Sequence, residues 1–319
     1  MIQAFNRFLQ KIMPYLTPSA VVIGVVFSDW FESFVFLVPW IFAVMTFTGS
    51  LGSNFTDLKK VIRHPVGMLA CIGVLHFVMP LIALGVGSIV FADDTYSTIG
   101  LVLSFVIPTG ITSLIWVSIY KGNVVLTLSI ILVDTFISPL AVPLMMKVFV
   151  GNAVEMNVQE IMTGLLWMIV IPSLVAMAVN QFAKKEVTQR LEANLAPLTK
   201  LGIGAVVTIN SSAVAPYFKN INAKLVLVAV VVCLIAMTAY FIGFLTGKLL
   251  KLDEESVISL TYNSGMRNIS GGAVIAIAYF PPPVAVPIIV GMLFQQVLAS
   301  FTGKIFAHRF SKRKAEAEG

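Results

Sequence analysis

The chain has little charge, few cysteines and few histidines for its length. Of its 319 residues, 11% are charged and 58% are hydrophobic, whereas about 25% of an average soluble domain is charged. This composition excludes a soluble globular domain and predicts an integral membrane protein. The two cysteines, Cys71 and Cys233, lie in apolar runs, so we expect buried thiols rather than a disulfide or a metal site. Because neither a metal-ligand cluster nor a nucleophile–base pair emerges, we expect a protein that is not an enzyme and has no cofactor.

The formal charge of +6 does not indicate a nucleic-acid partner. The basic residues are scattered through short connections, and membrane lipid is the expected surrounding. With ten spans and both termini inside, only Lys147, Lys219 and Lys224 fall on the opposite side and only Arg267 falls within the membrane. An excess of lysine and arginine marks the cytoplasmic side of a membrane protein. The charges therefore predict cytoplasmic termini.

Ten hydrophobic runs approach the roughly 20 residues that cross a bilayer. Their ranges are 15–28, 33–51, 66–92, 97–120, 123–149, 159–182, 197–215, 223–247, 254–279 and 284–306. Residues 1–13 are predicted to form an interfacial helix, and residues 309–319 a polar, disordered cytoplasmic tail. An odd number of spans in each half requires the second half to enter the membrane from the opposite side. We therefore predict an all-α protein of two inverted five-helix repeats, 1–152 and 153–308.

Two predicted spans are interrupted at corresponding positions, the fourth and the ninth. The first interruption is P-T-G-I-T-S at Pro108–Ser113, and the second is T-Y-N-S-G-M-R-N-I-S-G-G at Thr261–Gly272. Proline removes a backbone donor, and glycine permits unusual dihedral angles, so both helices should break there. Paired broken helices are typical of secondary transporters.

Arg267 is the basic residue within the second interruption. An arginine at the centre of a membrane helix costs roughly 2.5–3.5 kcal/mol, so it requires a partner, a water-filled cavity or an anionic ligand. Half-helix N-termini also favour anions, and a guanidinium offers a fork that fits a carboxylate. The pattern therefore predicts a carboxylate substrate.

Asp134 is the acidic residue well inside a predicted span. It could form an ion pair with Arg267, or it could titrate as a coupling proton site. His76, in the third span, could be a second proton carrier or a group that hydrogen-bonds two helices. Both alternatives remain open from the sequence.

Several motifs in order resemble those of the bile acid:sodium symporter family over nearly the whole chain. They are N-F-T-D-L-K-K-V-I-R-H-P from Asn54, P-T-G-I-T-S-L from Pro108, K-G-N-V from Lys121, S-P-L from Ser138 and G-M-R-N-I-S-G from Gly265. The resemblance implies a multi-pass protein of the bacterial inner (plasma) membrane. It also implies a panel of spans 1, 2, 6 and 7 beside a core in which spans 4 and 9 cross.

The resemblance implies coupling to two sodium ions, but the ligands for sodium are only partly retained. Ser113, Thr127 and Met266 match the family's ligand types. The departures are Leu114 for an asparagine, Ile131 for a threonine, His76 for a glutamine, Asn263 for the bridging glutamate and Arg267 for a glutamine. Losing an anionic ligand and gaining a cation disfavours sodium. Ser113, Thr127, Asn263 and Met266 are therefore interpreted as vestigial sodium sites, and Arg267 could itself replace an ion.

We expect a secondary carrier for a small organic anion, a carboxylate that is bile-acid-like or pantoate-like. The predicted substrate-facing residues are Arg267, Asn268, Asn263, Thr112, Ser113 and Asn210. Sodium coupling is predicted to be weak or absent, with Asp134 or His76 carrying a proton instead. The alternatives are a proton-coupled or sodium-independent carrier or exporter, and a membrane receptor without transport activity.

Overall fold

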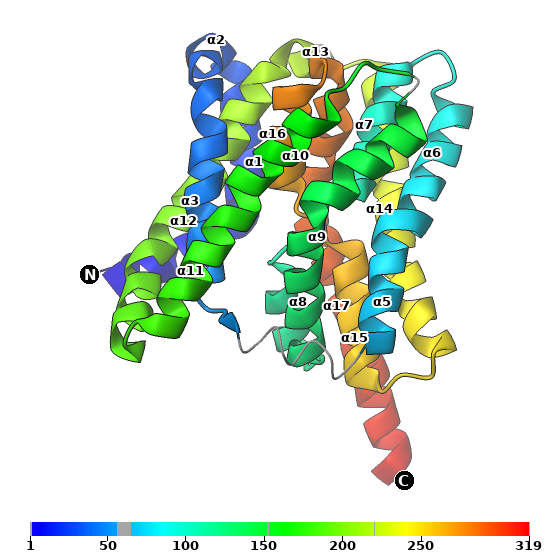
Figure 1. The fold of residues 1–319 in the computed structure, drawn as a ribbon. Coiled ribbons are helices and arrows are strands. Elements are labelled where there is room, and N and C mark those ends of the chain that lie inside the picture. Colours follow the sequence, from blue (N-terminus) through cyan, green and yellow to red (C-terminus); the bar gives the residue numbers. More distant parts are fainter. Residues whose placement is uncertain (1, 56–64, 152, 220, 319) are drawn as a thin grey trace.

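The computed structural model describes residues 2–55, 65–151, 153–219 and 221–318, and these ranges are helical apart from their connections (Figure 1). The elements are α1 (Ile2–Val26), α2 (Ser28–Phe31), η1 (Glu32–Leu37), α3 (Val38–Ser50), α5 (Pro65–Gly73), η3 (Val74–Val78), α6 (Met79–Val90), α7 (Thr95–Val106), α8 (Ser113–Ile119), α9 (Val124–Val150), α10 (Val158–Leu165), η4 (Leu166–Val170), α11 (Ile171–Phe182), α12 (Lys185–Ala213), α13 (Ala215–Lys219), α14 (Ala223–Leu249), α15 (Glu254–Gly265), α16 (Ile269–Tyr279), η5 (Pro282–Val284) and α17 (Ala285–Glu318). The one β-type contact in these ranges is an isolated bridge between Thr109 and Arg267.

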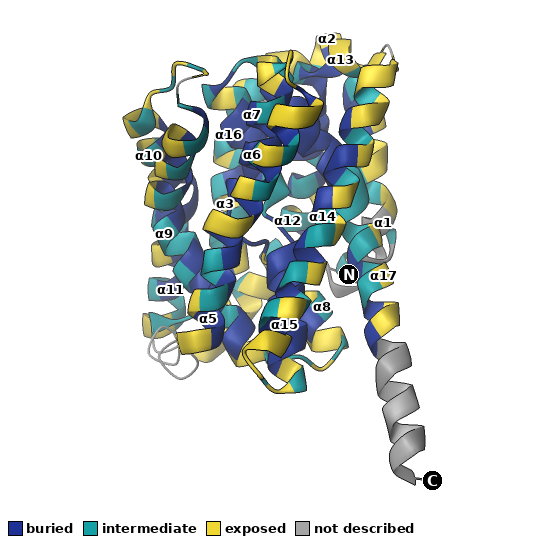
Figure 2. Cartoon of the chain, turned by 90° about the vertical axis from the view of Figure 1, so that its right-hand side faces the viewer, coloured by how far each residue is buried: buried dark blue, intermediate teal, exposed yellow. Residues whose placement is uncertain are grey.

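Six helical segments are long and apolar enough to cross a membrane. They are Ser28–Ser50, Pro65–Val90, Val124–Val150, Val158–Phe182, Ala223–Leu249 and Pro282–Phe306. Large apolar side chains such as Trp40, 72% exposed, lie on their outer surfaces, and Figure 2 shows exposed residues on the outside of the bundle around a buried interior. Since water would not tolerate so much exposed apolar surface, the chain is an integral membrane protein.

Three boundaries differ from the sequence-based expectation. α1 runs unbroken from Ile2 to Val26, so the prediction of a separate interfacial helix over residues 1–13 was wrong. α12 begins at Lys185, well before the predicted start at 197. Its first turns are helical but polar, and a prediction from apolar runs does not include them. α17 continues to Glu318, so the segment expected to be a disordered tail is helical. Most of the motif that begins at Asn54 lies outside the described residues.

α1, α3, α11 and α12 form one group of helices, which we call the panel; it occupies the left side of Figure 1. A Cβ atom added to Gly24 on α1 would lie 2.1 Å from the carbonyl oxygen of Thr208 on α12. Glycine is therefore needed for this close helix contact. In the middle of α12, Lys200 Nζ donates to Asn6 Oδ1 (2.5 Å), and at the end of α13, Lys219 Nζ donates to Ser28 Oγ (2.9 Å).

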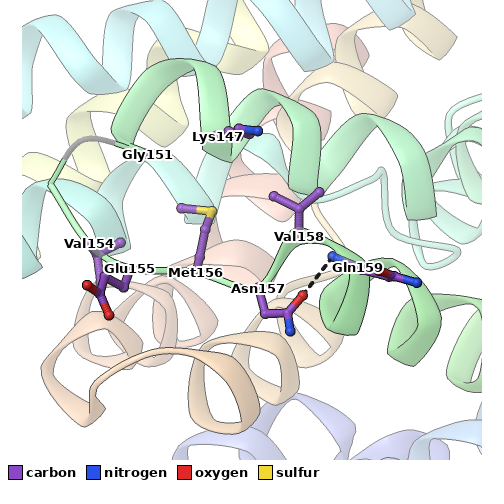
Figure 3. A pocket seen from close by; sticks show the side chains of 8 residues that line it. All are labelled: Lys147, Gly151, Val154, Glu155, Met156, Asn157, Val158 and Gln159. Carbon is purple, nitrogen blue, oxygen red and sulfur yellow. Dashed lines mark hydrogen bonds between the residues drawn. The ribbon is translucent and has the colours of Figure 1, made fainter.

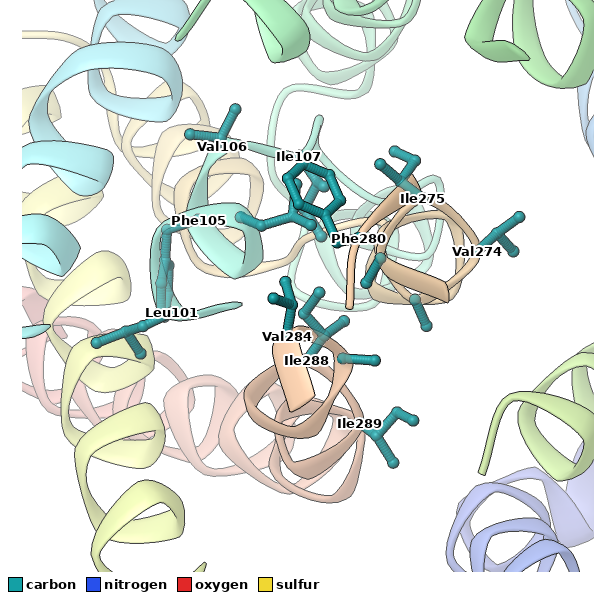
Figure 4. Close-up of a cluster of buried hydrophobic side chains, with 14 of the residues drawn as sticks. Leu101, Phe105, Val106, Ile107, Val274, Ile275, Phe280, Val284, Ile288 and Ile289 are labelled. Atoms are coloured by element: carbon teal, nitrogen blue, oxygen red, sulfur yellow. The ribbon is translucent and has the colours of Figure 1, made fainter. Parts of the chain in front are cut away.

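The remaining long helices form a second group that contains both broken spans. Figure 4 shows the apolar cluster between α7, α16 and α17, in which Leu101, Ile107, Ile275 and Ile288 are almost completely buried. This packing fixes α7 and α16, one half of each broken span, against each other. A full-length membrane helix is replaced here by two half-helices with buried ends.

Candidate functional site

The two helix breaks meet and pair through their backbones. Gly110 N–H donates to the Met266 carbonyl at 3.1 Å, and Asn268 N–H donates to the Pro108 carbonyl at 2.8 Å. With the antiparallel bridge between Thr109 and Arg267, these bonds make a minimal ladder. Irregular backbone at membrane depth is tolerated only when buried in protein or lining a cavity, and the ladder meets that requirement.

The central residue of each break has its amide bound by a side chain from the following long helix. Thr109 N–H donates to Asp134 Oδ2 on α9 at 2.6 Å. Arg267 N–H donates to Gln295 Oε1 on α17 at 3.1 Å. Sequence reasoning missed Gln295 and its neighbour Gln296. The available signal was a pair of adjacent amides inside an apolar span.

Four backbone amides at the starts of the half-helices that follow the two breaks have no partner among the described residues. They belong to Ile111 and Thr112 before α8, and to Ile269 and Ser270 at the start of α16. Ile111 is 46% exposed, and Thr112 and Ser270 are partly exposed. Such helix starts carry partial positive charge and bind anions.

Arg267 lies deeper than these amides, with 2% of its surface exposed. Its Nη1 atom is 3.5 Å from the carbonyl oxygens of Leu75 and of Ile107, while Nε and Nη2 have no hydrogen-bond partner in the described chain. The guanidinium therefore reaches two carbonyl oxygens, both at the limit of hydrogen-bond distance.

A proline frees the Leu75 carbonyl, and the end of α7 frees the Ile107 carbonyl. In the π-helical turn η3, Met79 N–H bonds to the Val74 carbonyl, and Pro80, the next residue, has no N–H for the Leu75 carbonyl. Ile107 immediately precedes the break at Pro108. The two carbonyls would otherwise be buried without donors, which would cost free energy, so Arg267 supplies what the backbone lacks.

Asp134 is fully buried and pairs with His76 rather than with Arg267. Asp134 Oδ1 is 2.6 Å from His76 Nε2, and Oδ2 accepts the Thr109 amide. His76 Nδ1 has no partner in the described chain. Nearby, Cys71 Sγ lies 3.7 Å from Ser264 Oγ. The acid and the histidine therefore form one buried hydrogen-bonded pair beside the first helix break.

The residues interpreted as vestigial sodium ligands converge on the Asn263 side chain. Its Oδ1 accepts from Ser113 Oγ at 3.1 Å, while its Nδ2 donates to Thr127 Oγ1 at 3.2 Å and to the Ser259 carbonyl at 2.8 Å. The Met266 carbonyl is already used by the ladder. An N–H group is thus directed at the oxygens that a cation would need, so this arrangement does not fit sodium.

Asn210 on α12 is fully buried, and both atoms of its amide lack a partner in the described chain. Thr208 faces Gly24 of α1, and a residue two positions later points to nearly the opposite side of the helix. α12 also packs on α16. The structure therefore places Asn210 on the panel face that is turned away from α1, with α16 among the neighbours of this helix.

An open pocket of about 740 Å³ lies elsewhere, at the connection between α9 and α10 (Figure 3). Lys147, Glu155 and Asn157 line it, and the Asn157 side chain accepts the Gln159 amide at 3.1 Å. Lys147 is 13 residues from Asp134 along α9, or about 20 Å. This pocket is not part of the crossover, the point where the two helix breaks meet.

The sequence of the chain is similar to those of known membrane transporters. The profile of the sodium bile acid symporter family matches residues 39–221. A Bacillus subtilis (strain 168) protein, uncharacterized protein YbaS, is 50% identical over 291 residues, covering 91% of this chain and 95% of the relative. Uncharacterized sodium-dependent transporter YocS from the same organism is 26% identical and covers 91% of both chains.

A plant relative extends the comparison. The probable sodium/metabolite cotransporter BASS1 of Arabidopsis thaliana chloroplasts is 25% identical over 288 residues, 88% of this chain and 70% of the relative. The family match, the apolar helices and the paired helix breaks together identify the chain as a membrane transporter that belongs to the sodium bile acid symporter family.

Proposed function

We propose that this chain is a secondary active carrier of a small organic anion that works by alternating access. The observation that carries the proposal is the pair of crossing helix breaks, each of which presents two unpartnered amides to a partly exposed surface. A carboxylate bound there would meet partial positive charge from both half-helices. Binding at the crossing point would let the panel and the second helix group move around it.

We propose ten spans arranged as inverted repeats, 1–152 and 153–308. The support is the two-fold character of the crossover. Pro108 and Met266 both accept, Gly110 and Asn268 both donate, and the central residues face each other. An antiparallel pair of equivalent segments is what an inverted repeat produces. The excess of basic residues on one side supports cytoplasmic termini in a bacterial inner membrane.

In the proposed site, the carboxylate lies at the start of α16, near Asn268 and Thr112. Both residues are partly exposed, and Asn268 also caps α16 by accepting the Gly271 amide at 3.2 Å. Asn210 would supply the panel side through its unpartnered amide, which suits a hydroxyl or carbonyl oxygen of the substrate. These contacts favour a small polar carboxylate, such as a hydroxy acid.

Sodium coupling is weak or absent in this proposal. Two relatives have names that refer to sodium. In this chain, however, the side-chain nitrogen of Asn263 donates to the oxygens of one vestigial site. Arg267 carries a positive charge into the carbonyl surroundings of the other. A tethered cation neutralises a site without responding to an ion gradient, and it repels sodium at short range.

The His76–Asp134 pair carries the proton in place of sodium. The two side chains are hydrogen-bonded at 2.6 Å, and Asp134 also holds the amide of Thr109 in the first break. Arg267 and the thiol of Cys71 are the other ionisable groups close to this pair. A proton gained or lost here would change the anchoring of the helix break directly.

The test begins with a thermal-shift screen of the purified protein against pantoate, pyruvate and taurocholate. Stabilising acids are then measured for uptake into proteoliposomes under separately imposed sodium and proton gradients. We expect a small carboxylate to stabilise the protein and to be driven by the proton gradient. Thr112→Val should weaken binding, whereas Thr238→Val should not, because the Thr238 hydroxyl bonds to the Leu234 carbonyl of its own helix α14.

The same experiment separates the alternatives. A strict sodium requirement would overturn the sodium-independent mechanism. Stabilisation by an acid without any flux in either direction would support a receptor. Equal stabilisation of the wild type and of Arg267→Gln would show that Arg267 is not the partner of the carboxylate, as its burial among carbonyls implies.

A further inference from the structure

Two adjacent glutamines on α17 each bind a different broken span. Gln295 Oε1 accepts the backbone amide of Arg267 in the second break, and Gln296 Oε1 accepts Trp116 Nε1, both at 3.1 Å. Trp116 lies on α8, one helical turn after Thr112, so it follows the first break. One helix therefore contacts both breaks through neighbouring amides.

The Gln295 bond completes the backbone hydrogen bonding of the second break. Met266 N–H donates to the Tyr262 carbonyl, and Asn268 N–H donates across the ladder to Pro108. Arg267 N–H is the amide between them, and the helix and the ladder leave it without an acceptor. Without Gln295 it would be a buried donor with no partner, which destabilises this backbone conformation.

The Gln296 bond is part of a larger contact between α17 and a stack of aromatic rings. Trp116 lies 6.3 Å from Tyr262, with their planes at 10°, and Tyr120 stacks on both rings. Tyr262 Oη donates to the Ala299 carbonyl at 3.1 Å. A Cβ atom added to Gly303 would lie 2.0 Å from the Tyr120 ring.

Residues 296, 299 and 303 are spaced at i, i+3 and i+7, which places them on one face of α17. That face holds Trp116 of α8 and Tyr262 of α15, one half-helix from each broken span. Within this stack, the Trp116 ring is held by a bond between two side chains, because its Nε1 donates to Gln296 of α17.

We propose that Gln295 and Gln296 are positioning residues that hold the two helix breaks in register on α17. Gln295 fixes the backbone of the second break, and Gln296 fixes the helix that follows the first. The unpartnered amides near Thr112 and Ser270 then keep a fixed separation around the carboxylate of one ligand. This inference rests on the proposed function for its consequence in transport, but the contacts themselves can be tested without any substrate.

The test uses the full-length protein in lipid nanodiscs. Gln295→Met keeps the side-chain length but removes the acceptor, whereas Gln295→Glu keeps an acceptor oxygen. The exposed Gln181 on α11 provides the matched control, Gln181→Met. Hydrogen–deuterium exchange is followed in the peptide that covers residues 261–272. We expect exchange to rise about tenfold in Gln295→Met, the order that loss of one buried hydrogen bond produces, and to stay near wild type in the other two variants.

Gln296 is tested with Trp116 in a double-mutant cycle. Gln296→Met and Trp116→Phe each remove one partner of the same bond, so their effects on the KM of pantoate uptake should not add in the double variant. We expect each to raise KM several-fold with a smaller change in maximal rate, because the site loses alignment while the carrier still moves.

Equal exchange in Gln295→Met and Gln295→Glu would overturn the role of Gln295, because the acceptor would then be irrelevant. Additive effects of Gln296→Met and Trp116→Phe would overturn the role of Gln296. If the wild type carries no pantoate, the proposed substrate class fails, yet the exchange comparison still decides the positioning role. The cycle is then run on exchange in the peptide that covers residues 109–120.

Discussion

Replacing Asn263 by glutamate and Arg267 by glutamine should make this transporter respond to sodium. The present Asn263 amide directs an N–H group at the Ser259 carbonyl (2.8 Å) and at Thr127 Oγ1 (3.2 Å). A glutamate at this position cannot donate when ionised, so those oxygens and Ser113 Oγ would be left to a cation. Arg267→Gln removes the competing positive charge.

The size of the effect follows from these distances. A sodium ion in contact with the freed oxygens would lie within about 4 Å of the new carboxylate, where unit charges attract by about 4 kcal/mol at an effective dielectric constant near 20. That is a factor of roughly a thousand in affinity. If it brings the dissociation constant near 1 mM, then about 100 mM sodium stabilises the folded state by about 2.7 kcal/mol.

The assay is thermal unfolding in sodium chloride against choline chloride at equal ionic strength. We expect no difference for the wild type and a sodium-specific rise of several degrees for the double variant Asn263→Glu/Arg267→Gln. Asn263→Glu alone should respond less, because Arg267 still repels the ion. A sodium-specific shift in the wild type, or none in the double variant, would refute the view that these two side chains replace sodium.

Three further predictions concern other parts of the structure. Pro80→Ala lets the turn η3 become α-helical and supplies an N–H that competes for the Leu75 carbonyl; uptake should fall although thermal stability is unchanged or higher. Burial opposes ionisation of Asp94, but the hydrogen bonds from Lys224 and from the α7 amide outweigh it and hold its pKa below the usual range. A carboxyl whose pKa is lowered by folding stabilises the protein above the ordinary carboxyl pKa. That contribution is lost as pH falls through the pKa of the folded state. Asp94→Asn should therefore cost less than about 1 kcal/mol near neutral pH, since the lysine is exposed, and nothing in strong acid, as unfolding curves at the two pH values would show. Gly24→Val should lower the melting temperature by several degrees, because its Cβ meets a backbone oxygen of α12 at 2.1 Å and overpacking costs about 1–3 kcal/mol.

Six of the ten predicted spans correspond to helices that are long and apolar enough to cross a membrane, because such helices consist of long apolar runs. The breaks at Pro108–Ser113 and Thr261–Gly272 were also predictable, since proline, glycine and polar residues are costly there. The failures have a common cause. The sequence of residues 1–13 and of 309–319 shows polarity, but polarity alone does not say whether a helix continues past the membrane.

The partners of the charged residues could not be predicted, because they depend on backbone groups. Arg267 contacts two carbonyls, one of which is free only because of the π-helical turn that contains His76. A π-helical turn has no reliable sequence signal. For the same reason the pairing of Asp134 with His76, rather than with Arg267, required the arrangement of three separate helices.

The two breaks are equivalent in geometry but not in charge, and this difference determines where proton coupling can act. Asp134 holds the central amide of the first break and Gln295 that of the second, so only the first is anchored by a group that can titrate. The variant Asp134→Asn removes the titratable acceptor while the central amide of the first break keeps an oxygen partner. If the proposed coupling is correct, this variant should still fold, as judged by its melting temperature, but His76 has lost its carboxylate and the first break no longer responds to protons. Uptake of the stabilising acid should then continue down its own concentration gradient and become independent of an imposed pH gradient. Uptake that still follows the pH gradient would place the coupling proton outside the His76–Asp134 pair.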